Sequence, residues 1–112
     1  MTTKSKKHEV FLPPLTHLQF AVLDALGASQ ITGRELRARL KANGIKKSGP
    51  AFYQMMSRLE DAKYVKGWYT QEIIDGQIIK QRHYKILGDG VRAFNETRKF
   101  YQASAVGIPA TV

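Results

Sequence analysis

Cysteine is absent from this 112-residue chain, which excludes disulfide bonds, thiolate zinc sites and thiol catalysis. Long apolar runs are absent too, because no stretch approaches the ~18 residues that a helix needs to span a bilayer. The apolar cluster from Val10 to Leu12 lies between charged residues and Pro13, so it does not form the core of a signal peptide. We therefore expect a cytoplasmic protein with no membrane partner.

Groupings of catalytic or metal-binding residues are missing as well. The three histidines, His8, His17 and His83, are isolated from one another and show no metal-binding spacing. The sequence has no glycine-rich phosphate loop and no readable grouping of a nucleophile, a base and an orienting residue. It therefore predicts a protein that is not an enzyme and that holds no metal and no cofactor.

Acidic residues are scarce relative to basic ones. The chain carries 18 Lys and Arg against 9 Asp and Glu, which gives a formal net charge of +9. A chain of this length forms one small domain, and this charge surrounds it with a strongly positive field. Partners rich in phosphate are therefore favoured, although ribosomal, membrane-surface and merely soluble proteins are also basic.

Capping residues predict two short helices in the first half of the chain. Thr16 is a candidate N-cap for the first helix, and Gly27 is placed to end it. The second helix opens at Thr32, which has capping-box spacing to Glu35, and runs to about Asn43.

A third helix is expected over residues 48–63. Ser48 is its N-cap candidate, and Pro50 lies in the first turn, where the missing amide hydrogen costs nothing. Apolar residues recur at spacings of three and four, which indicates one buried face. The expected buried residues are Phe52, Met55, Leu59 and Ala62.

The periodicity changes after the third helix, where β-forming residues without helical spacing predict a strand from about 64 to 74. The pair Asp75-Gly76 is typical of a two-residue type I′ turn, so a return strand is expected over 77–86. This turn predicts that Ile74 lies opposite Gln77, Glu72 opposite Ile79, and Thr70 opposite Gln81.

A last helix is expected over residues 88–103, with Asp89 as its N-cap. One approximate face of this helix carries Val91, Phe94, Arg98 and Tyr101. Residues 1–14 are expected to form a flexible basic arm, either a solubilising tail or a segment that contacts phosphates or a partner subunit. Residues 104–112 are expected to form a flexible tail.

The order helix, helix, helix, hairpin, helix is that of a winged helix-turn-helix with one added helix. We therefore predict an α+β, mainly α, fold with a DNA-binding domain over residues 15–87. In this fold the third helix enters the major groove of double-stranded DNA, and the hairpin lies on the adjacent backbone. The candidate DNA-binding residues are Arg34, Arg37, Lys46, Lys47, Ser48, Ala51, Tyr53, Gln54, Ser57, Arg58, Lys80 and Arg82.

Arg58 is the charged residue expected to reach bases from the third helix, because its planar guanidinium suits guanine. Alternatively, Arg58 pairs with a phosphate, with Glu60 or with Asp61. The basic residues as a set also allow a second interpretation, since surface helices are often rich in Arg and Lys simply to stay solvated. A winged-helix module that binds a protein partner is therefore the alternative to DNA binding.

Four segments carry a resemblance to a known family. They are Leu15-Thr-His-Leu-Gln-Phe-Ala-Val-Leu, Gly33-Arg-Glu-Leu, Ser48-Gly-Pro-Ala-Phe-Tyr with Arg58-Leu-Glu-Asp, and Arg82-His-Tyr-Lys-Ile ahead of Gly90. Together they resemble PadR-type transcriptional regulators over roughly residues 15–101. The resemblance implies a homodimer that binds a palindromic operator and usually represses transcription.

The resemblance also implies that the C-terminal helix pairs two subunits through Val91, Phe94, Arg98 and Tyr101. The alternative is that these residues close the core over the first helix. In PadR-like dimers, aromatic residues near the subunit junction can line a pocket for flat apolar compounds. Trp68 is therefore either a core or interface residue, or part of a site for a small aromatic effector.

Overall fold

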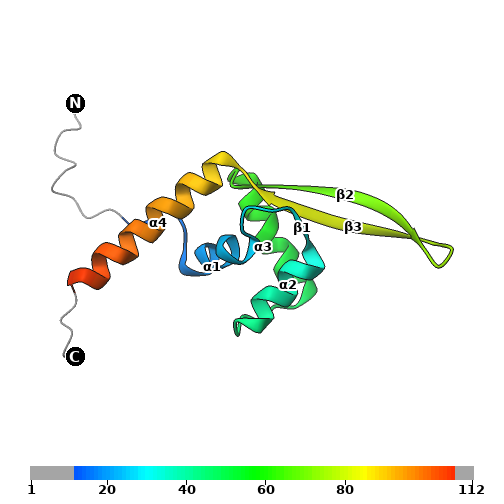
Figure 1. Ribbon diagram of the computed structural model, residues 1–112, viewed down its shortest axis with the longest axis horizontal. Helices are drawn as coiled ribbons and strands as arrows, with labels where there is room; N and C mark the ends of the chain where they lie inside the picture. Colours follow the sequence, from blue (N-terminus) through cyan, green and yellow to red (C-terminus); the bar gives the residue numbers. More distant parts are fainter. Residues whose placement is uncertain (1–11, 108–112) are drawn as a thin grey trace.

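The computed structural model describes residues 12–107, with side chains described as far as Ala103 (Figure 1). The elements are α1 (His17–Leu26), β1 (Ile31–Thr32), α2 (Gly33–Ala42), α3 (Gly49–Asp61), β2 (Val65–Ile74), β3 (Gln77–Ile86) and α4 (Gly88–Gly107). The predicted fold class is confirmed. Most of the arm predicted over residues 1–14, and residues 108–112 of the predicted tail, lie outside the described residues.

The starts of the first three helices are set by local hydrogen bonds. Thr16 and Thr32 each head a complete capping box, with Gln19 and Glu35 as the returning side chains. The Ser48 hydroxyl accepts a hydrogen bond from the backbone amide three residues later, 3.2 Å away. All three predicted N-caps are confirmed, because capping depends on residues that are close in sequence.

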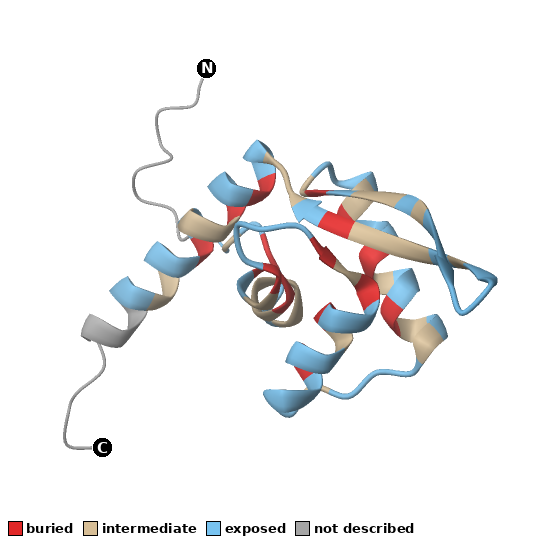
Figure 2. Ribbon diagram, turned by 45° about the vertical axis from the view of Figure 1, so that its right-hand side comes forward, coloured by how far each residue is buried: buried red, intermediate tan, exposed pale blue. Residues whose placement is uncertain are grey.

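The core lies where α1, α2, α3, the base of the sheet and one face of α4 meet, as the red segments of Figure 2 show. The buried face of α3 differs from the expected one. Phe52 and Leu59 are fully buried as predicted, but Met56 is the buried methionine, whereas Met55 is half-buried and Ala62 is exposed. Both methionines fit a helical spacing, and the direction in which the rest of the core lies selects Met56.

The sheet has three strands in the order β1-β3-β2. The turn between β2 and β3 has positive φ at both Asp75 (52°) and Gly76 (77°), which is the geometry of a type I′ turn. The predicted register is confirmed at all three expected pairs. The two-residue strand β1, which pairs Ile31 with Tyr84, was not predicted because so short a strand has no periodicity.

The last helix corrects two expectations. It begins at Gly88, so Asp89 lies inside the first turn and not at the N-cap, and its carboxylate pairs there with Arg92. An acidic side chain in the first turn is favoured by the helix dipole. The helix also continues to Gly107, four residues beyond the predicted end, through a segment that contains the strong helix former Ala.

The first part of α4 packs on α1. The rings of Phe94 and Phe20 stack with centroids 4.7 Å apart, and the Tyr101 hydroxyl lies 3.2 Å from Nδ1 of His17. Phe94 and Tyr101, two of the four residues expected at a subunit interface, therefore pack against α1, while Val91 and Arg98 are exposed. The role of these four residues in dimerisation stays a prediction. Within the described part of the chain, no helix is long and apolar enough to cross a bilayer.

Candidate nucleic-acid interface

The exposed face of α3 is polar and carries little charge. Burial of Phe52 on the opposite side turns Tyr53, Gln54, Ser57 and Arg58 outward, and all four are exposed. Among the described residues, Arg58 makes no ion pair, and Glu60, one of the partners considered for it, binds a different arginine. The Arg58 guanidinium is thus available to a molecule that contacts this face.

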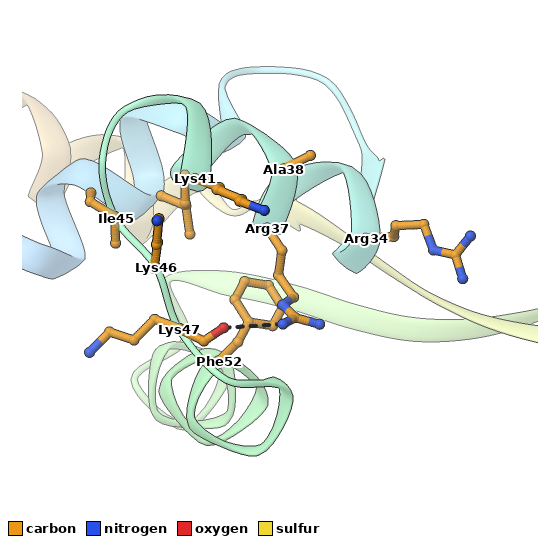
Figure 3. Close-up of a pocket in the computed structure, with 9 residues that line it drawn as sticks. Arg34, Arg37, Ala38, Lys41, Ile45, Lys46, Lys47 and Phe52 are labelled. Atoms are coloured by element: carbon orange, nitrogen blue, oxygen red, sulfur yellow. Dashed lines mark hydrogen bonds between the residues drawn. The ribbon is translucent and has the colours of Figure 1, made fainter.

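A basic hollow lies beside this helix, between α2 and α3 (Figure 3). We call it the α2–α3 cleft; its volume is about 360 Å³. Its lining combines five cations with apolar residues: Arg34, Arg37, Lys41, Lys46 and Lys47 with Ala38, Leu40, Ile45 and Phe52. The sequence-predicted cations of α2 and of the segment after it are therefore brought together in one place.

Arg37 is held in position within the α2–α3 cleft. Its Nη2 donates a hydrogen bond to the backbone carbonyl oxygen of Lys47 over 3.1 Å, as Figure 3 shows. Its guanidinium carbon also lies 5.9 Å from the centroid of the Phe52 ring. These contacts tie α2 to the entry of α3 and fix one charge near the positive end of the α3 dipole.

A second hollow of about 300 Å³ lies between the helices and the β2–β3 hairpin, which we call the wing. This α3–wing groove is lined by Thr32, Arg34, Tyr53, Ile74, Ile79, Lys80, Gln81 and Arg82. Arg34 borders both hollows and Tyr53 comes from the exposed face of α3. Basic surface therefore adjoins α3 in two directions, toward α2 and toward the wing.

Arg82 does not project freely from the wing. Its Nη2 donates to Oε1 of Glu60 on α3 over 2.7 Å, and the two side chains are only 20% and 25% exposed. The guanidinium carbon lies 4.5 Å from the centroid of Tyr69 and 5.7 Å from that of Tyr84. The phosphate contact expected of Arg82 stays a prediction, and it competes with these partners.

Gly67 leaves room for the ends of the Arg82 and Glu60 side chains, which a larger residue would have to displace. A Cβ at Gly67 would lie 2.7 Å from Nη2 of Arg82 and 2.9 Å from Oε1 of Glu60. Burial raises the pKa of Tyr84 to about 12, although the neighbouring Arg82 acts in the opposite direction. We call Glu60, Gly67, Tyr69, Arg82 and Tyr84 the wing anchor, because they tie the hairpin to α3.

Trp68 lies on the other face of the wing. Its ring stacks on His83 with centroids 5.7 Å apart, and a ring nitrogen of His83 lies 2.8 Å from the Thr70 hydroxyl. The effector role considered for Trp68 stays a prediction. No group of three or more His, Cys, Asp or Glu able to hold a metal ion occurs among the described residues.

Several solved structures of transcriptional regulators have a fold similar to that of this chain. A PadR family transcription regulator from Clostridium difficile has a TM-score of 0.69 at 13% identity, over 81% of this chain and 93% of that one. A PadR family transcriptional regulator from Eggerthella lenta has a TM-score of 0.63 at 21% identity, over 80% of this chain and 76% of that one.

Bacillus subtilis PadR in complex with operator DNA has a TM-score of 0.63 at 19% identity, over 88% of this chain and 54% of that one. No protein-family model and no curated protein matched the sequence. The chain is thus a winged-helix protein. Its particular fold is that of the PadR-like transcriptional regulators, which confirms at the level of fold the resemblance carried by its sequence.

The wing anchor generates a prediction about stability. In a double-mutant cycle, Glu60→Gln and Arg82→Gln should show a coupling free energy of unfolding of about 1 kcal/mol or more, because the pair is charge-assisted and mostly shielded from water. Urea unfolding of the wild type, the two single variants and the double variant measures this coupling.

A matched cycle uses Asp61→Asn with Arg82→Gln. Asp61 is exposed and makes no ion pair with the residues described, so its effect should add to that of Arg82→Gln within about 0.5 kcal/mol. If the Glu60 and Arg82 substitutions were equally additive, the ion pair would not hold the wing to α3.

Proposed function

We propose that this protein is a DNA-binding transcriptional regulator in which α3 enters the major groove of double-stranded DNA. The observation that carries the proposal is that two basic hollows adjoin α3, one toward α2 and one toward the wing. A groove-reading helix needs phosphate-binding groups on both sides, because the two backbones border the groove it occupies. The solved PadR complex with operator DNA has the same fold, which supports this reading.

In this proposal the α2–α3 cleft holds the backbone on one side of α3. Lys46 and Lys47 precede the helix, and Arg37 is already fixed beside them. Backbone amides at the start of α3 add partial positive charge at the same place. Neutralising phosphates there releases counterions, so binding should weaken as salt concentration rises.

The α3–wing groove holds the opposite backbone through Lys80, while Arg34 borders both hollows and can reach a phosphate from either. Lys80 is exposed and its Nζ lies 5.0 Å from the centroid of Tyr69, so it extends along the wing above the anchor. The wing anchor then has a positioning role, because it sets how far Lys80 lies from the bases reached by α3. Ser48 and Ala51, at the start of α3, border the region where the helix meets the backbone.

Bases are read by Arg58, with Tyr53, Gln54 and Ser57 as further contacts. One arginine offers a bidentate match to guanine, and the other three side chains offer hydrogen bonds or contact with a thymine methyl group. So small a set discriminates few positions. Most of the affinity therefore comes from contacts with phosphates. The helix α3 sets where the protein sits along the duplex and supplies a limited sequence preference.

We also propose that the regulator is a homodimer that represses transcription from a palindromic operator. An apolar hollow of about 220 Å³ beside the start of α4, lined by residues that include Leu23, Ile86 and Val91, suits a side chain of a second copy. Selection of bound duplexes from a random pool tests this: half-sites in inverted repeat about 34–36 Å apart are expected, and an unrepeated site would contradict it.

The main test separates base reading from phosphate binding. Arg58→Ala should make the binding free energy less favourable by ~1–3 kcal/mol and reduce the difference in affinity between duplexes of different sequence. Lys80→Ala should weaken binding to all duplexes alike, and it should reduce the slope of log affinity against log salt concentration by about 1. Titrations of labelled duplexes at about 50 mM and about 200 mM salt measure both effects.

Lys99→Ala, an exposed lysine of α4, is the charge-matched control and should change neither quantity beyond a small electrostatic effect. If Arg58→Ala left affinity and preference untouched, the base-reading role would be wrong. An absence of salt-sensitive binding to any duplex at low ionic strength would favour the alternative, a winged-helix module that binds a protein partner.

A further inference from the structure

The far end of the wing exposes an unusual amount of apolar surface. Ile73 and Ile78 face each other across the two strands and are 77% and 69% exposed, and the neighbouring Ile74 is 46% exposed. We call residues 71–79 the wing tip. Branched aliphatic side chains gathered at such a point are typical of a surface that another molecule covers.

The charge of the wing tip argues against DNA as that molecule. Residues 71–79 contain Glu72 and Asp75 but no Lys or Arg, in a chain with 18 basic residues. Carboxylates are repelled by the phosphates that border either groove of DNA. The part of the wing that suits DNA is the stretch nearer the helices, which carries Lys80, with Ile74 and Ile79 at the edge of the α3–wing groove. The exposed end of the tip, with Ile73 and Ile78, suits a basic, partly apolar protein surface instead.

The chain itself contains a surface of that kind. The α2–α3 cleft has five cations around its rim, and the apolar residues that it leaves accessible are the exposed Ala38 and the half-buried Ile45. No wing residue lines this cleft in the same copy: Ile74 and Ile79 border the separate α3–wing groove, and the turn at Asp75 lies at the far end of the paired strands (Figure 1). A tip that occupies such a cleft therefore occupies that of a second copy.

We propose that the wing tip of one copy docks in the α2–α3 cleft of a second copy. Ile73 and Ile78 cover the apolar lining of the cleft, and Asp75 and Glu72 pair with its rim of lysine and arginine side chains. If each copy inserts its tip into the other, the two contacts are equivalent and the assembly closes as a two-fold dimer.

This docking has a regulatory consequence that rests on the proposed function. The cleft that would receive the tip is the one assigned to backbone phosphates, so self-association and DNA binding compete for Arg37, Lys46 and Lys47. The tip contact would then close the cleft to DNA, and duplex DNA would displace the tip, whereas the contact between copies proposed beside α4 would persist on DNA. The tip contact itself does not depend on DNA binding.

The absence of cysteine allows a direct cross-linking test with the full chain. Gln77→Cys places a thiol at the exposed wing tip, and Ala38→Cys places one in the lining of the cleft without removing a charge. Mixed in equal amounts without DNA, these two variants should form a heterodimer with a short bismaleimide, and high salt or duplex DNA should suppress it.

Ala62→Cys, exposed at the end of α3 and not among the cleft residues, is the matched control. Mixed with Gln77→Cys, it should give only background cross-linking. Equal yields from the Ala38→Cys and Ala62→Cys mixtures would overturn the proposal.

A second variant separates this proposal from the proposed function. The double substitution Ile73→Thr with Ile78→Thr keeps strand propensity and should weaken self-association, measured by sedimentation without DNA, by about tenfold or more. Gln30→Thr, an exposed polar position outside both the wing tip and the α2–α3 cleft, should leave it unchanged. If the double variant instead lost DNA affinity with self-association unaltered, the tip would be a DNA contact and the proposal would be wrong.

Discussion

The contact between the wing and α3 is the constraint on which the rest of the structure depends. At its centre the rings of Phe52 and Tyr84 meet edge to face with centroids 6.3 Å apart, and beside them Glu60 binds Arg82. This contact places a hairpin of two ten-residue strands at a fixed angle to a helix whose outer face is exposed. Without it, the groove that carries Lys80 and the helix that carries Arg58 would have no defined separation, and neither would match the fixed spacing of a DNA groove.

The features predicted correctly from the sequence are those that depend on neighbouring residues. The caps at Thr16, Thr32 and Ser48 and the Asp75-Gly76 turn each follow from a few consecutive side chains, and the turn alone fixes the register of both long strands. The choice of Met56 over Met55, the strand β1 and the Glu60–Arg82 pair depend on how distant segments meet, which no local pattern encodes. For Arg82, the pairing of its strand position with Tyr69 was implied by the predicted register, but the approach of Glu60 was not.

The distribution of charge divides the molecule into surfaces with different partners. Basic side chains gather around α3 in two hollows, while the wing tip is apolar and acidic. A uniformly basic surface would bind polyanions in many orientations. Basic hollows beside one helix, toward α2 and toward the wing, instead fix how the protein is placed on the duplex. The tip and the α2–α3 cleft are complementary to each other, so the same cations serve DNA binding and, in our proposal, association between copies.

The central claim is that duplex DNA contacts the outer face of α3 and both flanking hollows at once. Backbone amide chemical shifts of the isotope-labelled protein, followed by NMR during titration with duplex DNA, test it most directly. We predict that shifts concentrate in the start of α2, in the segment from Lys46 to Arg58 and around Lys80, with little change at the wing tip. Shifts confined to α4 or to the wing tip, with α3 unaffected, would contradict the account.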